Sequence, residues 1–297
     1  MSSPIVVAFG GGLNSSAMVV EMVRRKERID ALLFADTGGE RPETYAHVKE
    51  FSAWLEARGY PPVSVTRFKT GSGEVETLEA RCLSQNMLPS LAYGYKKCSV
   101  RFKQDPQHKW LKQWEPAGAA WRRGERVVKV IGYDADEMYR PENAKKKRLE
   151  GKRMADMVAS GLRKKSDKDI NARLVNDWAM YEYRYPLADE WDMGRAECIA
   201  TMREAGLTPP PKSSCFFCPA NSEFEIVELY EKHPDLLERA LAIEANAEGR
   251  DGIEPKLGRW RSWRRVIEEW TRQGSLFDLS SLRRPDPDDV PCGCYDG

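Results

Sequence analysis

The stretch that decides the fold is "PIVVAFGGGLNSS", Pro4 to Ser16. An apolar run leads directly into three glycines, and the following "AMVVEMV" has helical periodicity. Glycines at a strand-to-helix turn let backbone amides approach an anion, and the helix N-terminus adds partial positive charge. The stretch lacks the Gly-Lys-Ser/Thr of one phosphate loop and the Gly-x-Gly-x-x-Gly of the dinucleotide fingerprint. It predicts a phosphate-binding turn of another kind, with a tight turn before a capped helix as the alternative.

Further apolar strands alternate with helices beyond this turn. Strands are predicted at 29–36, 62–68, 126–134 and, with a turn, 183–191, and helices at 15–28 and 42–58. This alternation predicts an α/β fold, a doubly wound, Rossmann-like parallel sheet followed by a mainly helical C-terminal region. In such sheets ligands bind beyond the carboxyl ends of the strands. Three polar stretches follow strands in this way, at 10–16, 36–44 and 132–140.

The composition narrows the class of protein. Of 297 residues, 41% are hydrophobic and 31% are charged, with a net charge of +1 and seven cysteines. These values are typical of a soluble globular protein, and no stretch approaches the ~20 apolar residues that cross a bilayer. With no signal-peptide pattern, we expect a cytoplasmic protein without membrane contact. The odd cysteine count favours thiols, a metal site or catalysis over a disulfide framework, and nucleic-acid contacts would need local basic patches.

The chain divides into three predicted parts. Residues 1–190 form a nucleotide-binding domain, 191–280 a helical region with a Cys-x-x-Cys pair, and 281–297 a flexible cysteine-containing tail. The charged stretch 145–173 is a solvated helix or loop, or a lid that contacts a phosphate backbone. The helical stripe Trp260, Trp263, Val266 and Trp270 favours core packing over base stacking.

Four motifs together carry a family resemblance. "GGGLNSS" resembles the phosphate loop of the PP-loop ATP pyrophosphatases, and "FADTGGERPETY" is similar to an element of their PAPS reductase branch, of adenine nucleotide alpha hydrolase type. "KKCSVRFKQDP" and "IGYDADEMYR" resemble that branch's cysteine-containing and nucleotide-bordering segments. The resemblance covers about residues 4 to 235. Gly10, Asn14 and Ser99 stand where the family often has serine, aspartate and a second cysteine.

The resemblance implies a set of nucleotide-binding residues. Gly11, Gly12, Asn14, Ser15 and Ser16 would hold the phosphates, and Asp36, Thr37 and Gly132 would border the nucleoside. The candidate Mg²⁺ ligands are Asp134, Asp136 or Glu137. The candidate cations for binding anions are Arg101, Lys103 and Arg140. A charge cluster at a helix N-terminus is the alternative for the three acids. The alternative for these three cationic residues is that they are ordinary surface residues that bind no ligand.

The cysteines predict a metal site and a nucleophile. Cys215 and Cys218, in "SSCFFCP", can reach one metal, and the resemblance brings Cys98 close to the nucleotide. Three thiolates suit an iron–sulfur cluster, with zinc as the alternative, and a redox dithiol or buried thiols remain open. The tail "PCGCYDG" loosely resembles the mobile Glu-Cys-Gly tail of sulfonucleotide reductases. Cys98, Cys292 and Cys294 are therefore the candidate catalytic thiols. Alternatively, Cys292 or Cys294 in the tail is a fourth ligand of the predicted cluster or has no role. Cys82 and Cys198 lie in helical contexts and are predicted core residues.

Three functions follow from this sequence. The first is an ATP-dependent PP-loop enzyme that adenylates a substrate, releases pyrophosphate and supports sulfur transfer, as in nucleic-acid thiolation or phosphorothioation. The second is a PAPS or APS reductase that releases sulfite with a thioredoxin-like reductant. The third is a nucleotide-binding subunit without catalysis. The expected cofactors are ATP or PAPS, Mg²⁺ and an iron–sulfur cluster. The expected partners are a nucleic acid, a cysteine desulfurase or thioredoxin-like protein, and a second copy of the chain.

Overall fold

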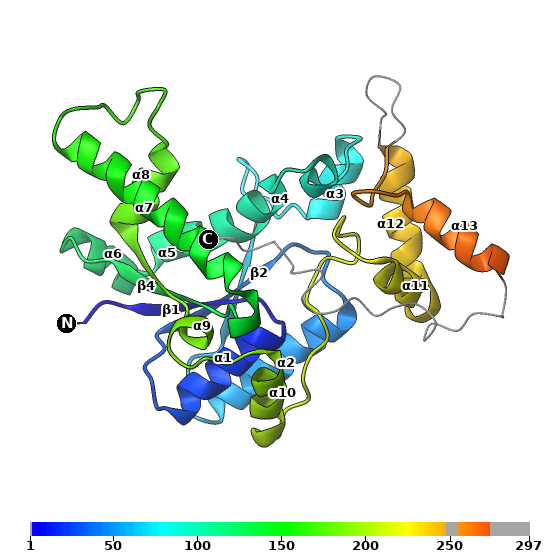
Figure 1. Cartoon of the computed structure of the whole chain (residues 1–297), viewed down its shortest axis with the longest axis horizontal. Coiled ribbons are helices and arrows are strands. Elements are labelled where there is room, and N and C mark those ends of the chain that lie inside the picture. The colour runs from blue at the N-terminus through cyan, green and yellow to red at the C-terminus, as the bar shows by residue number, and fades with distance from the viewer. Residues whose placement is uncertain (1, 248–254, 274–297) are drawn as a thin grey trace.

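A five-stranded parallel sheet forms the centre of the molecule (Figure 1). The computed structural model describes residues 2–247 and 255–273. The strands are β1 (Ile5–Phe9), β2 (Ala31–Asp36), β3 (Val63–Arg67), β4 (Val127–Ile131) and β5 (Tyr181–Arg184). Their spatial order is β3-β2-β1-β4-β5, and every pairing is parallel. The predicted α/β fold is confirmed.

The strand order reverses between β1 and β4. The first three strands run outward from β1 on one side, and β4 and β5 continue on the other. Crossovers that leave in opposite directions open a crevice at this point, and open α/β sheets bind ligands there. The turns that follow β1 and β4 therefore lie at the most favourable ligand position of the fold.

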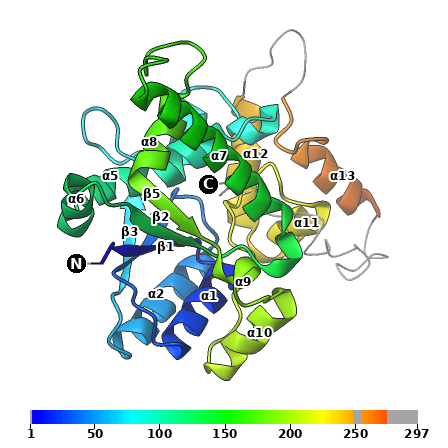
Figure 2. The ribbon, with the colours of Figure 1, turned by 60° about the vertical axis from the view of Figure 1, so that its left-hand side comes forward.

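One face of the sheet is covered by α1 (Leu13–Arg24), α2 (Pro42–Glu56) and α10 (Arg195–Glu204), as Figure 2 shows. Their side chains form one apolar cluster with β1 and β2. Phe51 of α2 is fully buried, and its ring stacks on Phe9 at 5.1 Å and on Trp54 at 5.5 Å. Cys198 of α10 is fully buried here, as predicted.

The opposite face is covered by α5 (Asp105–Gln113), α6 (Glu115–Arg122), α7 (Tyr139–Ala159) and α8 (Ala172–Met180) (Figures 1 and 2). Leu111 and Ala117 pack against Val6 and Val127 of the sheet. The predicted charged stretch 145–173 is mostly helical, because α7 continues to Ala159 and packs along α8.

A second apolar cluster gathers helices from distant parts of the chain. It joins α3 (Leu78–Ser84) and Phe102 with α11 (Glu223–Lys232), α12 (Pro234–Asn246) and α13 (Trp263–Gln273). Cys82 is 1% exposed within it, which confirms the predicted core position. The remaining elements are η1 (Ser90–Tyr93), α4 (Lys97–Ser99), the π-helical η2 (Val100–Gln104), η3 (Ala135–Glu137) and α9 (Pro186–Asp189).

Two sequence predictions are corrected by the helix boundaries. Helix α1 begins at Leu13 rather than Ser15 and ends at Arg24, because Lys26 takes a left-handed φ of 56°. The tryptophan stripe is only partly core. Trp263 is fully buried and Val266 nearly so, whereas Trp260 precedes α13 and is 83% exposed. Across the described ranges, no helix is both long and apolar enough for a membrane span.

Candidate functional site

The turn between β1 and α1 depends on two glycines. Gly11 has a φ of +71°, a left-handed conformation that strains other residues, and a Cβ there would lie 3.1 Å from Val48. Gly12 is the N-cap of α1 in extended conformation, and no side chain caps it. The first N–H groups of α1 have no intrahelical acceptor, so they are available to an anion in front of the helix.

The two serines of the turn bond to its own backbone. The hydroxyls of Ser15 and Ser16 both donate to the Gly12 carbonyl, at 3.1 and 2.9 Å, and Ser15 Oγ accepts from Gly10 N–H at 3.2 Å. Since Ser16 gives its proton to Gly12, His47 Nε2–H donates to Ser16 Oγ at 2.8 Å. Burial lowers the pKa of His47 to about 4, so this imidazole is neutral at pH 7. These hydroxyls hold the turn in shape.

The turn after β4 packs directly on the first turn. A Cβ on Gly132 would lie 2.9 Å from Ser15 Cα, so only glycine fits without moving the backbone. Asn14 Nδ2 donates to Asp134 Oδ2 at 2.7 Å and fastens the two turns together. Burial, with help from neighbouring carboxylates, raises the pKa of Asp134 to about 6. Four of the predicted residues, Asn14, Ser15, Gly132 and Asp134, therefore meet at the switch point of the sheet.

The other predicted acids near β4 are occupied by protein partners. Asp136 Oδ2 accepts from the Arg195 backbone N–H at 2.7 Å, at the start of α10. Glu137 pairs with buried Arg140 at 2.9 Å, and the Arg140 guanidinium lies 4.3 Å from the Tyr133 ring centroid. This geometry matches the helix-terminus alternative for these acids. Their role as Mg²⁺ ligands stays a prediction.

Asp36, at the end of β2, shapes the loop that follows it. One carboxylate oxygen accepts from Gly38 N–H at 2.8 Å and from the Tyr45 hydroxyl at 2.7 Å. The other accepts from Arg67 Nε at 2.8 Å. Burial and the hydrogen bond to Asp36 raise the pKa of Tyr45. Asp36 thus fixes the conformation of the loop that carries Thr37.

The Cys-x-x-Cys segment pairs with this same loop. Phe216 N–H donates to the Gly39 carbonyl at 2.7 Å, and Glu40 and Cys215 form an antiparallel bridge. Thr37 Oγ1 lies 3.1 Å from Cys215 Sγ, at hydrogen-bond distance. Two motifs 170 or more residues apart are therefore brought together beside the crevice, which their sequences alone did not show.

A neighbouring serine reaches the glycine turn itself. Ser213 Oγ donates to the Gly10 carbonyl at 2.6 Å, and a Cβ on Gly12 would lie 3.3 Å from Ser213 Cβ. The C-terminal region thus covers the first turn. Sequence reasoning missed Ser213 and His47. The only signal for Ser213 was its position two residues before Cys215.

The three predicted metal-binding thiols border one cluster. Cys215 and Cys218 are buried in the second apolar cluster, and partly buried Cys98 packs against it. Within the described part of the chain, however, no three His, Cys, Asp or Glu side chains are arranged to hold a metal ion. The donor set does not fit a metal centre as it stands, and no reaction step is derived through one. Cys292 and Cys294 lie outside the described residues.

Two of the predicted anion-binding residues, Lys103 and Arg101, have different surroundings. Lys103 Nζ lies 3.5 Å from Glu40 Oε1, so it faces the loop that pairs with Cys215. The Arg101 guanidinium lies 5.0 Å from the Phe68 ring centroid and is exposed. Lys103 is the better placed of the two for an anion in the crevice.

Fold and site together define a parallel α/β protein with a glycine-rich strand-to-helix turn at its switch point. No family model and no curated protein matches the chain. Among solved structures, the chain is similar to the U34-tRNA thiolase NcsA from Methanococcus maripaludis with its [4Fe-4S] cluster. That likeness has 14% sequence identity and a TM-score of 0.40, and covers 95% of this chain and 84% of that chain. It is too distant to transfer any property of that enzyme.

Proposed function

We propose that this protein binds ATP at the β1–α1 turn and cleaves its α–β phosphate bond, transferring the adenylyl group to a substrate. The observation that carries this proposal is the close packing of Gly132 on the Asn14–Ser15 backbone. It places a flat, side-chain-free wall beside the N-terminus of α1 at the sheet's switch point. A polyphosphate can then approach the amides while the nucleoside lies along Gly132.

In the proposed reaction, a substrate oxygen attacks the α-phosphorus as the bond to the bridging oxygen breaks. Pyrophosphate leaves with that electron pair, and the α1 N-terminus stabilises its charge. The neutral His47 and the serine hydroxyls keep the turn preorganised. No step is assigned to Mg²⁺, because the predicted carboxylates are engaged by Asn14, Arg195 and Arg140.

The proposed second step replaces the adenylated oxygen by sulfur on a nucleic acid. The outer sulfur of a persulfide from a cysteine desulfurase attacks the adenylated carbon or phosphorus, and AMP leaves with the oxygen. The new carbon–sulfur or phosphorus–sulfur bond is then still joined to the persulfide cysteine through a disulfide. A second thiol cleaves this bond, forms a disulfide with that cysteine and leaves the sulfur on the nucleic acid. Support for this finer proposal is the contact of Cys215 with Thr37 at the crevice. It also draws on the resemblance of "GGGLNSS" to the PP-loop pyrophosphatases.

A reductase is the second candidate, favoured by one specific observation. The loop that resembles the PAPS reductase element is the one bridged to Cys215. In that reaction a thiolate attacks the sulfate sulfur and the adenosine phosphate leaves. A thioredoxin-like dithiol then supplies two electrons, is oxidised to a disulfide and releases sulfite.

The central test measures AMP and pyrophosphate released from ATP with pooled nucleic acids and a desulfurase. Gly132→Ala should weaken ATP binding at least tenfold, about 1.4 kcal/mol, because its methyl group meets the α1 backbone. Gly71→Ala is the matched control, since an added Cβ there has no atom within 4 Å and Gly71 lies outside the turn. Equal ATP binding by the Gly132→Ala protein would overturn the assignment of this site.

A parallel assay separates the alternatives. Sulfite release from PAPS, lost in Cys292→Ser or Cys294→Ser, would replace the adenylation proposal by the reductase. Tight ATP binding without any product would instead support the non-catalytic subunit.

A further inference from the structure

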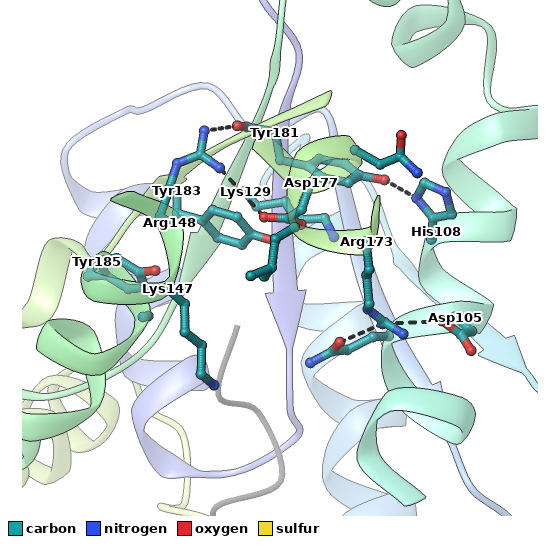
Figure 3. A pocket seen from close by; sticks show the side chains of 14 residues that line it. Asp105, His108, Lys129, Lys147, Arg148, Arg173, Asp177, Tyr181, Tyr183 and Tyr185 are labelled. Atoms are coloured by element: carbon teal, nitrogen blue, oxygen red, sulfur yellow. Dashed lines mark hydrogen bonds and ion pairs between the residues drawn. The ribbon is translucent and has the colours of Figure 1, made fainter. Parts of the chain in front are cut away.

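A second cavity, of about 380 Å³, lies on the face of β4 and β5 beneath α5, α7 and α8 (Figure 3). None of the glycine-turn residues lines it. Its labelled side chains converge from five elements, and cations outnumber anions. The charged members are Lys129, Lys147, Arg148, Arg173, Asp105 and Asp177. A volume in this range is sufficient for a small organic ligand.

The floor of this cavity carries a buried lysine. Lys129 interrupts the apolar strand "VVKVI", and this residue is only 6% exposed. Its ammonium lies 3.8 Å from the Tyr181 ring centroid and, among the described residues, forms no hydrogen bond. Burial lowers the pKa of Lys129 to about 8. Asp177 acts on this ammonium through its charge and Tyr181 through its ring. A buried ammonium is costly without hydrogen bonds, and an anion in the cavity would supply one.

Two further polar side chains line the cavity beside Lys129. Tyr185, the residue directly after β5, is 3% exposed and lines the same cavity. One terminal nitrogen of Arg148 donates to the Tyr181 carbonyl. The other lies 3.6 Å from Asp177, is buried and makes no hydrogen bond. Figure 3 shows Arg148 and Tyr185 beside Lys147, on the α7 side of the cavity. Donors from β4, from α7 and from the residue after β5 thus surround one cavity.

The remaining wall is aromatic. Tyr181 and Tyr183 of β5, and Tyr185 directly after it, are spaced two residues apart, so their rings share one face of the sheet. Tyr183 and Tyr185 are nearly parallel, with an angle of 6° between the rings. The mouth carries Lys147 and Arg173, which are exposed. A phosphate alone would use the cations and leave this aromatic wall without a role.

We propose that this cavity binds a nucleoside monophosphate unit, with its phosphate on Lys129 and Arg148 and its base against the β5 tyrosines. Base stacking on aromatic side chains is worth ~1–3 kcal/mol per base. The unit can come from a free nucleotide or from a single-stranded nucleic acid that follows the basic helix α7. The inference does not depend on ATP binding at the glycine turn, because the two sites share no lining residue.

The test is calorimetric titration of the full chain with UMP, with 5′-phosphorylated tetrauridylate and with inorganic phosphate, all in saturating ATP. UMP should bind, and Lys129→Met should weaken it at least tenfold. Lys147→Ala should weaken UMP binding at least threefold. Because Lys147 is exposed, this variant keeps the test valid if Lys129→Met misfolds. Lys146→Ala is the matched control on α7, since Lys146 does not line the cavity, and should bind as the wild type does.

Each outcome decides the proposal. Tighter binding of the tetranucleotide than of UMP assigns the site to nucleic acid, and the reverse assigns it to free nucleotide. Inorganic phosphate binding as tightly as UMP would overturn the nucleotide class. No UMP binding, or UMP binding unchanged in both Lys129→Met and Lys147→Ala, would overturn the site itself. These outcomes do not depend on whether Gly132→Ala weakens ATP binding at the glycine turn, so the two proposals can fail separately.

Discussion

The two faces of the sheet are filled by different kinds of side chain. Beneath α1, α2 and α10, the fully buried Phe51 stacks in an apolar cluster around β1 and β2. Beneath α5, α7 and α8, the face instead presents Lys129, His108 and Arg148 around a cavity. The first face is packed like a stability core, whereas the second face holds the cavity for which a nucleotide is proposed. Four predictions test this contrast, from the largest expected effect to the smallest.

Phe51→Ala should cost about 3–5 kcal/mol of unfolding free energy, because it empties a site stacked on Phe9 and Trp54. Urea unfolding followed by circular dichroism measures the loss. Leu83→Ala, at an exposed position, is the control and should change stability little. A loss below about 1 kcal/mol would show that this face is not the stability core.

Lys129→Met should leave the protein as stable or more stable at pH 7, because it removes a buried ammonium and keeps similar volume. The folded pKa of about 8 lies below the ordinary value of 10.5. The unfolded chain therefore binds more protons between these values, and wild-type stability should rise with pH across this window by up to about 3 kcal/mol.

The Lys129→Met protein should lack this rise. Denaturation midpoints from pH 7 to 10.5 measure the difference between the two proteins. Parallel pH profiles for both would mean that Lys129 is solvated, and the contrast between the faces would weaken.

His47 gives the first face a pH dependence of its own. Its pKa of about 4 lies below the ordinary 6.5, so the unfolded chain binds more protons between these values. Stability should fall by about 2 kcal/mol as pH drops from 6.5 to 4. His47→Gln, which can still donate to Ser16, should reduce this slope. Nuclear magnetic resonance titration of the His47 ring reads the pKa directly, and a value near 6.5 would contradict the buried geometry.

Asn14→Ala should have the smallest effect, about 1 kcal/mol at pH 7.5, because it removes one hydrogen bond to the Asp134 carboxylate. It should also raise the pKa of Asp134 further above about 6. The gap between wild type and variant should narrow at pH 5, where Asp134 is largely protonated in both. A gap that stays constant with pH would mean that the amide does not stabilise the charged form.

Much of the candidate site was predictable because its residues directly follow strands. Gly11, Gly12 and Gly132 were expected beside a ligand, and the structure brings the two turns into contact. Asp36 was also placed correctly at a strand end, although its bonds shape a loop. The role of Ser213 was not predictable, because it bonds to Gly10 across 203 residues. Lys129 was read only as part of an apolar strand, since one lysine barely changes the pattern of "VVKVI".

The sequence by itself determined the parallel α/β architecture, the order of strands and helices along the chain, and the glycine turn. These features follow from local periodicity and from backbone conformations that only glycine adopts easily. Only the tertiary structure decided that the cysteine segment pairs with the β2–α2 loop, and that Lys129 faces a tyrosine-lined cavity. Such contacts depend on which helices cover each sheet face, and no short stretch of sequence encodes that choice.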